Sequence, residues 1–96
     1  NLQSDARFAE SFLRQRLSRG HGPVRIRQEM RQKGISDTEI EMAMAAEQPD
    51  WCDLAEAAYR RKFGKLPPDD IKDKARRSRF MQYRGFALDQ YQHLMD

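Results

Sequence analysis

The 96-residue sequence lacks the features that mark secreted and membrane proteins. Its one cysteine, Cys52, has no partner for an internal disulfide, which is typical of proteins from a reducing compartment. No apolar run approaches the roughly 18 residues that span a membrane, and the N-terminus does not resemble a signal peptide. We therefore predict a cytoplasmic protein that does not bind membranes.

The sequence also has few residues arranged for catalysis or metal binding. His21 and His93 have no second ligand at the spacing of a metal site, and Cys52 has no CxxC partner. No base is placed to activate Cys52 as a nucleophile. Residues 20–23 are glycine-rich but lack the Lys-Ser/Thr pair of a phosphate-binding loop, so they indicate a tight turn. We expect no catalytic residue, metal or cofactor, and a protein that is not an enzyme.

The composition indicates a small folded protein with a thin core. Hydrophobic residues make up 39% of the chain and charged residues 34%, and the mean hydropathy is −0.97. Five Phe, three Tyr and one Trp argue against wholesale disorder. A chain of this size does not enclose the deep pocket that most small-molecule enzymes use.

Charge is distributed in blocks, although the net charge is only +3. The segment 7–33 has eight basic and two acidic residues, a net of +6, and the segment 60–84 has ten basic and three acidic residues, a net of +7. Between them, residues 36–47 contain four acidic residues and no Lys or Arg, a net of −4. Alternating blocks of this kind can present basic stripes to a polyanion, or they can be solvated helix faces.

Apolar residues recur with helical spacing along nearly the whole chain, and no alternating run indicates a strand. Pro23 suits the first turn of a helix, and the glycines at 34 and 85 suit helix ends. Ser36 opens a capping-box pattern, and Asp50 and either Asp69 or Asp70 are further candidate N-caps. The predicted helices cover residues from about 4 to 18, 23–33, 37–47, 51–63, from 70 or 71 to about 83, and a short last helix over 88–95.

The helical spacing also predicts which side chains face the core. Cys52, next to Trp51, is expected to be a small core residue, and Lys62 is expected to lay its stem along the apolar stripe. The other residues expected to face inward are Phe8, Phe12, Leu13, Leu17, Ile26, Met30, Ile40, Ala43, Met44, Leu54, Ala55, Ala58, Tyr59, Phe63, Ile71, Ala75, Phe80, Tyr83, Leu88, Tyr91, Leu94 and Met95.

The second half of the chain repeats the first at an offset of 51 residues. The matching pairs are Phe8 with Tyr59, Phe12 with Phe63, Met30 with Met81, Gly34 with Gly85, Ile35 with Phe86, Ile40 with Tyr91 and Met44 with Met95. So many matches at one offset favour duplication over the chance likeness of amphipathic helices. We predict an all-α fold: an elongated, curved tandem array of two three-helix repeats, at residues 1–48 and 49–96, whose function lies in a long surface.

Arginine-bearing helices are the candidate binding surface. Arginine at regular spacing suits bidentate contacts with carboxylates or phosphates. Arg27 and Glu29 are two residues apart and do not pair along one helix face, which leaves Arg27 free to reach outward. The predicted partner-binding residues are Arg25, Arg27, Arg31 and Lys33 in the first repeat and Arg76, Arg77 and Arg79 in the second.

A basic helix after a turn also resembles a DNA recognition helix. Only Gln28 and Gln32 are available there to read bases, and glutamine is common on any solvated surface. We therefore rank base-specific recognition below a binding surface formed by charge.

Several segments together resemble the RecX family of regulatory proteins. Residues 4–10, SDARFAE, resemble its acidic-x-Arg-Phe-Ala segment, and residues 20–30, GHGPVRIRQEM, resemble its Gly-aromatic-Gly-Pro-x-x-Ile-x-x-Glu-Leu signature. Residues 33–36 and 79–86 resemble two later motifs of the family, in which a basic residue and a glycine are followed by an aromatic or aliphatic residue. His21 stands where an aromatic residue is usual, and Met30 where leucine is usual.

The resemblance implies a bacterial modulator of the RecA recombinase that is not an enzyme. Such proteins bind the RecA filament on single-stranded DNA, limit its extension, and depress ATP hydrolysis, strand exchange and co-protease activity. The chain resembles the second and third repeats of the family, and the first is not represented. We expect a monomer that lies in the filament groove and binds DNA alone weakly.

The alternative function is that of a basic helical nucleic-acid-binding module, which would bind DNA tightly with a steep salt dependence. A third function, that of a small hydrolase, is disfavoured.

Overall fold

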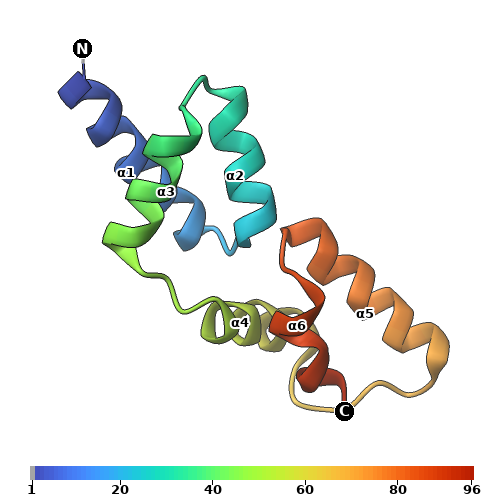
Figure 1. Cartoon of the computed structure of the whole chain (residues 1–96). Helices are drawn as coiled ribbons and strands as arrows, with labels where there is room; N and C mark the ends of the chain where they lie inside the picture. Colours follow the sequence, from blue (N-terminus) through green and yellow to red (C-terminus); the bar gives the residue numbers. More distant parts are fainter. Residues whose placement is uncertain (1) are drawn as a thin grey trace.

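The computed structural model describes the backbone of residues 2–96 and the side chains of residues 6–96, so Asn1, the first residue of the first predicted repeat, lies outside it. The described residues form helices and no strand, as predicted (Figure 1). The final predicted helix divides into a short α-helix and a 3₁₀-helix. The elements are α1 (Leu2–Ser18), α2 (Pro23–Gln32), α3 (Asp37–Glu47), α4 (Trp51–Phe63), α5 (Ile71–Arg84), α6 (Leu88–Tyr91) and the 3₁₀-helix η1 (Gln92–Met95).

Polar side chains cap three of these helices where the sequence predicts it. The Ser36 hydroxyl accepts a hydrogen bond from the backbone N–H of Glu39 at the start of α3. Asp50 caps α4 in the same way, and Asp70, rather than Asp69, caps α5. Each cap satisfies a backbone donor that has no partner within the helix.

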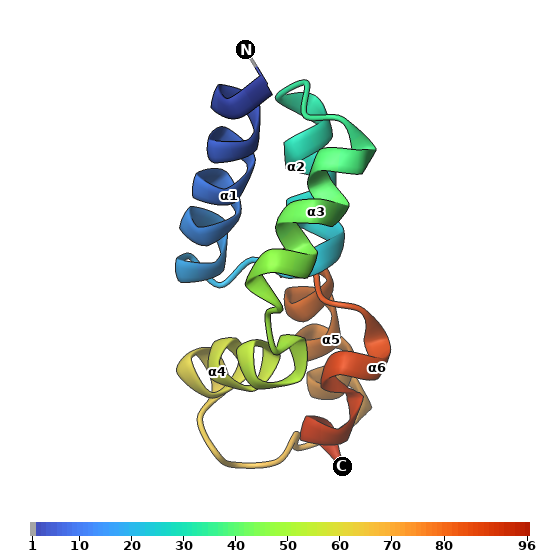
Figure 2. The same cartoon turned by 60° about the vertical axis from the view of Figure 1, so that its left-hand side comes forward.

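The helices form two three-helix units placed one after the other (Figure 2). The core of α1–α3 and the core of α4–α6 with η1 are separate clusters, and Trp51 packs against both. The molecule measures 52 × 19 × 18 Å, which confirms the predicted elongated, all-α array of two three-helix units. The limits of the repeats at 1–48 and 49–96 stay a prediction.

The two units repeat the same backbone geometry at the predicted offset. Gly34 ends α2 with φ +83° and Gly85 ends α5 with φ +98°. After each glycine, the next residue donates a backbone hydrogen bond to a methionine carbonyl five residues earlier, from Ile35 to Met30 and from Phe86 to Met81. Both methionines are fully buried. A left-handed glycine with this bond is a standard helix C-terminus, and here it occurs twice.

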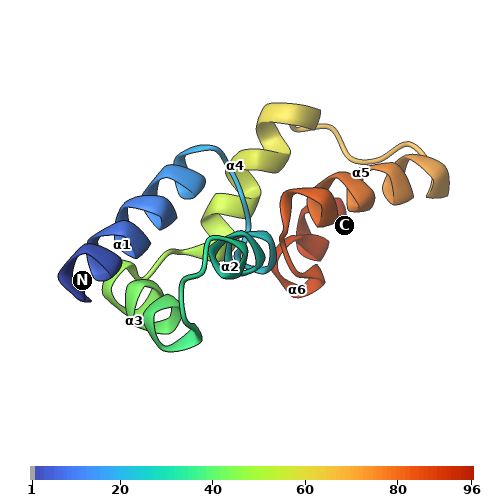
Figure 3. The same ribbon diagram turned by 90° about the horizontal axis from the view of Figure 1, so that it is seen from above.

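The units are joined where the N-terminus of α2 meets the C-terminus of α5 (Figures 1 and 3). The N–H of Gly22 donates to the carbonyl of Arg84 at 2.7 Å, and the N–H of Val24 donates to the carbonyl of Gly85 at 3.0 Å. The first N–H groups and the last carbonyls of a helix have no partners within it. The two helix ends therefore satisfy each other, and their end dipoles attract.

This contact requires glycine on both sides. A Cβ at Gly22 would overlap the backbone carbonyl of Gly85, and a Cβ at Gly85 would overlap the Cβ and backbone nitrogen of Arg25. A Cβ at Gly34, the repeat equivalent of Gly85, would meet nothing within 4 Å. Gly85 is therefore constrained by the other unit as well as by its own φ.

An arginine occupies the core of the second unit. Arg77 is 6% exposed and stands 51 residues after Ile26, which is fully buried in the first unit. Its Nη1 donates to the Tyr59 hydroxyl at 2.9 Å and to the Leu66 carbonyl at 2.8 Å, and its Nη2 lies 3.1 Å from Asp73 Oδ2. The hydrogen bond to Tyr59 raises the pKa of Arg77, so the guanidinium stays charged.

Several residues predicted to face the core are exposed instead. Ile71 and Tyr83 are 86% and 71% exposed, because α5 turns only Arg77 and Met81 fully inward. Cys52 is exposed on the outer side of α4, which corrects its prediction as a core residue. Phe8 and Leu88 are also exposed.

Gly85→Ala is expected to destabilise the protein more than Gly34→Ala. Both substitutions place an L-residue in the left-handed region, which costs about 1 kcal/mol, but only Gly85→Ala also forces α2 away from α5, at about 2 kcal/mol more. Urea unfolding measures both free energies. Small-angle scattering is expected to show a larger radius of gyration for Gly85→Ala alone, and equal effects of the two variants would contradict the proposed constraint.

Arg77→Ile is expected to reduce the free energy of unfolding by about 2 kcal/mol, because Tyr59, Leu66 and Asp73 lose their buried donor. The double variant Arg77→Ile/Tyr59→Phe carries the residues of the first unit at these positions and leaves no hydroxyl unpaired. We expect it to recover part of the loss in a urea-unfolding series. If Arg77→Ile unfolds at the same urea concentration as the wild type, the hydrogen bonds and ion pair of Arg77 do not stabilise the fold.

Candidate functional site

The arginines of α2 are largely neutralised by carboxylates of α3. Arg27 makes two hydrogen bonds to the Glu41 carboxylate, at 3.1 and 3.3 Å, and Arg31 Nε lies 2.9 Å from Asp37 Oδ1. The prediction that Arg27 reaches outward is therefore wrong, since its partner comes from the neighbouring helix. The basic block and the acidic block are separate in sequence but lie against each other in the fold.

Glu29 gathers three further basic side chains around one carboxylate. Arg16 Nε lies 3.3 Å and His21 Nδ1 3.1 Å from its Oε1, and Arg25 Nε lies 3.5 Å from its Oε2. Burial lowers the pKa of His21, although its hydrogen bond to Glu29 acts in the opposite direction. His21 is therefore neutral at pH 7 and donates a hydrogen bond rather than forming an ion pair.

Arg25 also links α2 to the second unit. Its Nη1 donates to the Tyr83 carbonyl at 3.3 Å, and its guanidinium lies 5.0 Å from the centre of the Tyr83 ring. This contact leaves the tyrosine on the surface, beside the junction. Cation–π contacts of this kind contribute about 0.5–1 kcal/mol at exposed sites.

The three predicted residues of α5 have different environments. Arg76 is exposed but bonded to Asp73 at 2.7 Å, and it lies 5.2 Å from the centre of the Phe63 ring. The backbone N–H of Asp69 and the guanidinium of Arg76 lower the pKa of Asp73. Arg77 is in the core, which corrects the expectation of a surface residue. Arg79 is exposed.

The arrangement brings α2 and α5 together along one side of the molecule, end to end (Figure 1). Lys33 lies at the far end of α2 and Arg79 midway along α5, and both are exposed. Neither forms an ion pair with the residues that the structure describes. Of the seven predicted residues, these two are the cations least committed to internal contacts.

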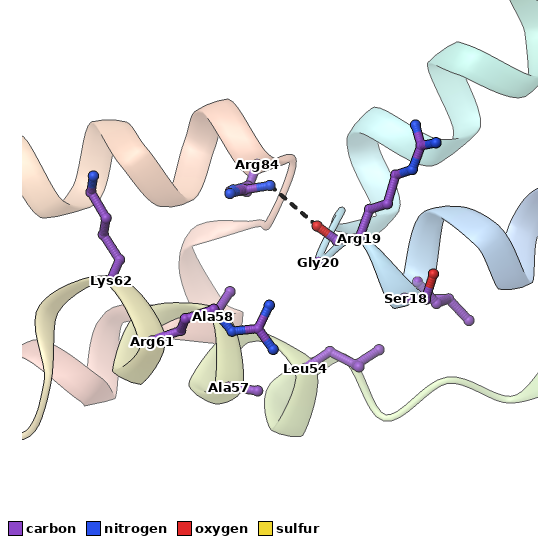
Figure 4. A pocket seen from close by; sticks show the side chains of 10 residues that line it. Ser18, Arg19, Gly20, Leu54, Ala57, Ala58, Arg61, Lys62 and Arg84 are labelled. Atoms are coloured by element: carbon purple, nitrogen blue, oxygen red, sulfur yellow. Dashed lines mark hydrogen bonds between the residues drawn. The ribbon is translucent and has the colours of Figure 1, made fainter.

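A second basic region lies in a cleft between the units, which we call the junction cleft (Figure 4). Its hollow has a volume of about 230 Å³. The ends of α1 and α5 and one side of α4 surround it. The residues that line it are Leu17, Ser18, Arg19, Gly20, Leu54, Ala57, Ala58, Arg61, Lys62 and Arg84.

Three cationic side chains belong to this cleft, and none of its lining residues is acidic. Arg84 Nη1 donates to the Arg19 carbonyl at 3.2 Å, and the Arg19 side chain points away from the hollow (Figure 4). Lys62 and Arg84 both lie over the Phe80 ring, at 5.6 and 5.3 Å from its centre. The sequence alone does not predict this cleft.

A sequence signal for the cleft does exist. Arg61, Lys62 and Arg84 all lie in the last turns of helices, where cations offset the negative end of the helix dipole. That role is ordinary, so the spacing alone does not distinguish a binding site from helix capping. Only the meeting of α1, α4 and α5 places these residues around one hollow.

In the described part of the chain, no helix is both long and apolar enough to cross a membrane. No group of three or more His, Cys, Asp or Glu side chains among those residues is placed to hold a metal ion.

Comparison with known proteins agrees with the two-unit architecture. Residues 4–44 match the family model "RecX, second three-helix domain", and residues 49–95 match "RecX, third three-helix domain". The chain is 46% identical over 94 residues to the protein named Regulatory protein RecX from Chromohalobacter salexigens, covering 98% of this chain and 61% of that protein. It is 43% identical over 95 residues to the protein of the same name from Vibrio campbellii, covering 99% of this chain and 61% of that protein.

The chain thus spans about three fifths of the length of these relatives. Both its three-helix units and nearly all of its residues are accounted for by one family. The chain belongs to the RecX family of regulatory proteins.

Proposed function

We propose that this chain binds the RecA filament on single-stranded DNA and inhibits its extension and activities, including ATP hydrolysis, strand exchange and co-protease activity. Membership of the RecX family supports this function. The observation that carries it is the end-to-end placement of α2 and α5 along a molecule 52 Å long, because this side can follow the groove of a helical filament. The chain acts as a cytoplasmic monomer and without enzymatic activity.

The proposed filament-binding face consists of the outward cations of α2 and α5. Lys33 and Arg79 are its exposed members without an ion pair among the described residues, whereas Arg76 is exposed but bonded to Asp73. Arg25 supports the face at the junction. Arg27, Arg31 and Arg76 each contribute less than an unpaired cation, because Glu41, Asp37 and Asp73 already form ion pairs with them. Exposed ion pairs are worth about 0–1 kcal/mol each, so binding depends on several contacts together.

A direct nucleic-acid-binding module is the second candidate function, and the junction cleft favours it. A module of that kind binds DNA alone as tightly as it binds a RecA–DNA filament. A filament regulator binds the filament far more tightly. Titrating the chain against both at one salt concentration separates the two functions.

The triple variant Lys33→Glu/Arg76→Glu/Arg79→Glu is expected to weaken binding to preformed RecA filaments at least tenfold and to lose inhibition of RecA ATP hydrolysis. Each reversal replaces an attraction to an acidic group with a repulsion of similar size. The measurements are anisotropy of a labelled chain on filaments and the steady-state rate of ATP hydrolysis.

The matched control is Arg7→Glu/Arg14→Glu/Lys65→Glu, which makes the same change in net charge at three exposed cations that lie on neither α2 nor α5. It is expected to bind and inhibit nearly as the wild type does. Equal losses in both variants would show that only net charge matters. Failure of the unchanged chain to bind filaments would refute the proposed function itself.

A further inference from the structure

We propose that the junction cleft binds the phosphodiester backbone of single-stranded DNA. The inference deepens the proposed function and rests on it in one respect: it assigns the DNA of the filament to the cleft, and leaves the recombinase to the outward cations of α2 and α5. Binding of DNA by the cleft is itself a property of this chain alone and can be measured without RecA.

The cationic side chains of the cleft carry more positive charge than the helix dipole at the cleft needs for balance. The C-terminus of α1 lies at the hollow and carries the equivalent of about half a negative charge. The C-terminus of α5 is already paired with the N-terminus of α2. Arg61, Lys62 and Arg84 bring three full positive charges to the hollow. These charges exceed what the helix end needs for balance, in a hollow with no acidic lining residue. An anion is the ligand that balances the excess.

Arg84 is held in place before any ligand arrives. Its Nη1 is fixed by the Arg19 carbonyl and its guanidinium rests on Phe80. Its Nε is buried and has no hydrogen-bond partner among the described residues. A buried guanidinium nitrogen without an acceptor is costly. Because the side chain is already fixed, binding an anion costs it little further entropy.

The shape and lining of the cleft indicate the backbone of a nucleic acid rather than its bases. Leu17, Leu54, Ala57 and Ala58 supply apolar walls against which a sugar can pack, and no aromatic ring lines the hollow to stack on a base. A single strand carries one negative charge per nucleotide. Neighbouring phosphates can therefore reach Arg61 and Lys62 on α4 and Arg84 on α5 at once. Contacts of this kind bind without sequence preference.

The test compares Arg61→Gln/Lys62→Gln with the control Arg7→Gln/Lys74→Gln, which removes two exposed cations away from the cleft. Binding of a labelled single-stranded oligonucleotide is followed by anisotropy over a series of salt concentrations. Each phosphate contact contributes about 0.7 to the slope of log affinity against log salt for single strands. The cleft variant is expected to lower the slope by about 1.4, and the control to leave it unchanged. Equal slopes for the cleft variant and the wild type would overturn the proposal.

Two competitors identify the chemistry of the ligand. An oligonucleotide of the same length without bases is expected to displace the labelled strand from the wild type as well as the normal strand does. Polyglutamate of the same charge is expected to displace it at least tenfold less well. Equal competition by polyglutamate would make the cleft a general anion site, and failure of the abasic strand would show that bases are read. Either result would overturn the assignment.

The outcomes also separate this inference from the proposed function. If the chain fails to bind RecA filaments but the cleft variant lowers the salt slope on free DNA, the proposed function is refuted and the DNA site remains. If the cleft variant keeps the wild-type slope while the chain inhibits RecA, the cleft assignment is refuted alone. Urea unfolding of each variant confirms that the exposed substitutions leave the fold intact.

Discussion

The contact between the N-terminus of α2 and the C-terminus of α5 determines the shape of the whole molecule. Two backbone hydrogen bonds, from Gly22 and Val24 to the carbonyls of Arg84 and Gly85, join helices that belong to different units. They pair donors and carbonyls that have no partner within their own helices. Because neither glycine can accept a Cβ, the approach is close and the angle between the units is narrowly constrained. The length of the array and the course of its basic side both follow from this contact.

The same contact determines where positive charge remains available. In the first unit, α3 brings Glu41 and Asp37 to Arg27 and Arg31, so the arginines of α2 are nearly balanced in space. In the second unit, the acidic residues near α5 are taken up by Arg76 and Arg77. The junction brings the ends of α1 and α5 against one side of α4, and with them cations that have no acidic residue beside them in the lining of the cleft. Positive charge thus remains available between the units as well as along α5.

The two units fill one equivalent core position with side chains of different chemistry. At equivalent positions, the first unit buries Ile26 and the second buries Arg77. The arginine reaches the Leu66 carbonyl and so fastens the connection between α4 and α5 to the core. A buried ion pair is a costly way to gain stability compared with apolar packing. In this protein the buried Arg77 orients α5, and it therefore also positions the cations that α5 carries.

The sequence by itself determined the six helices, their caps, the 51-residue repeat and the all-α tandem array. These depend on local spacing and on glycines with positive φ, which the chain carries whatever its tertiary contacts are. It did not determine which arginines are free. The pairing of Arg27 with Glu41, the burial of Arg77 beside Tyr59 and the exposure of Tyr83 depend on how helices distant in sequence pack. The junction cleft arises in the same way, because its cations come from separate helix ends that only the tertiary structure brings together.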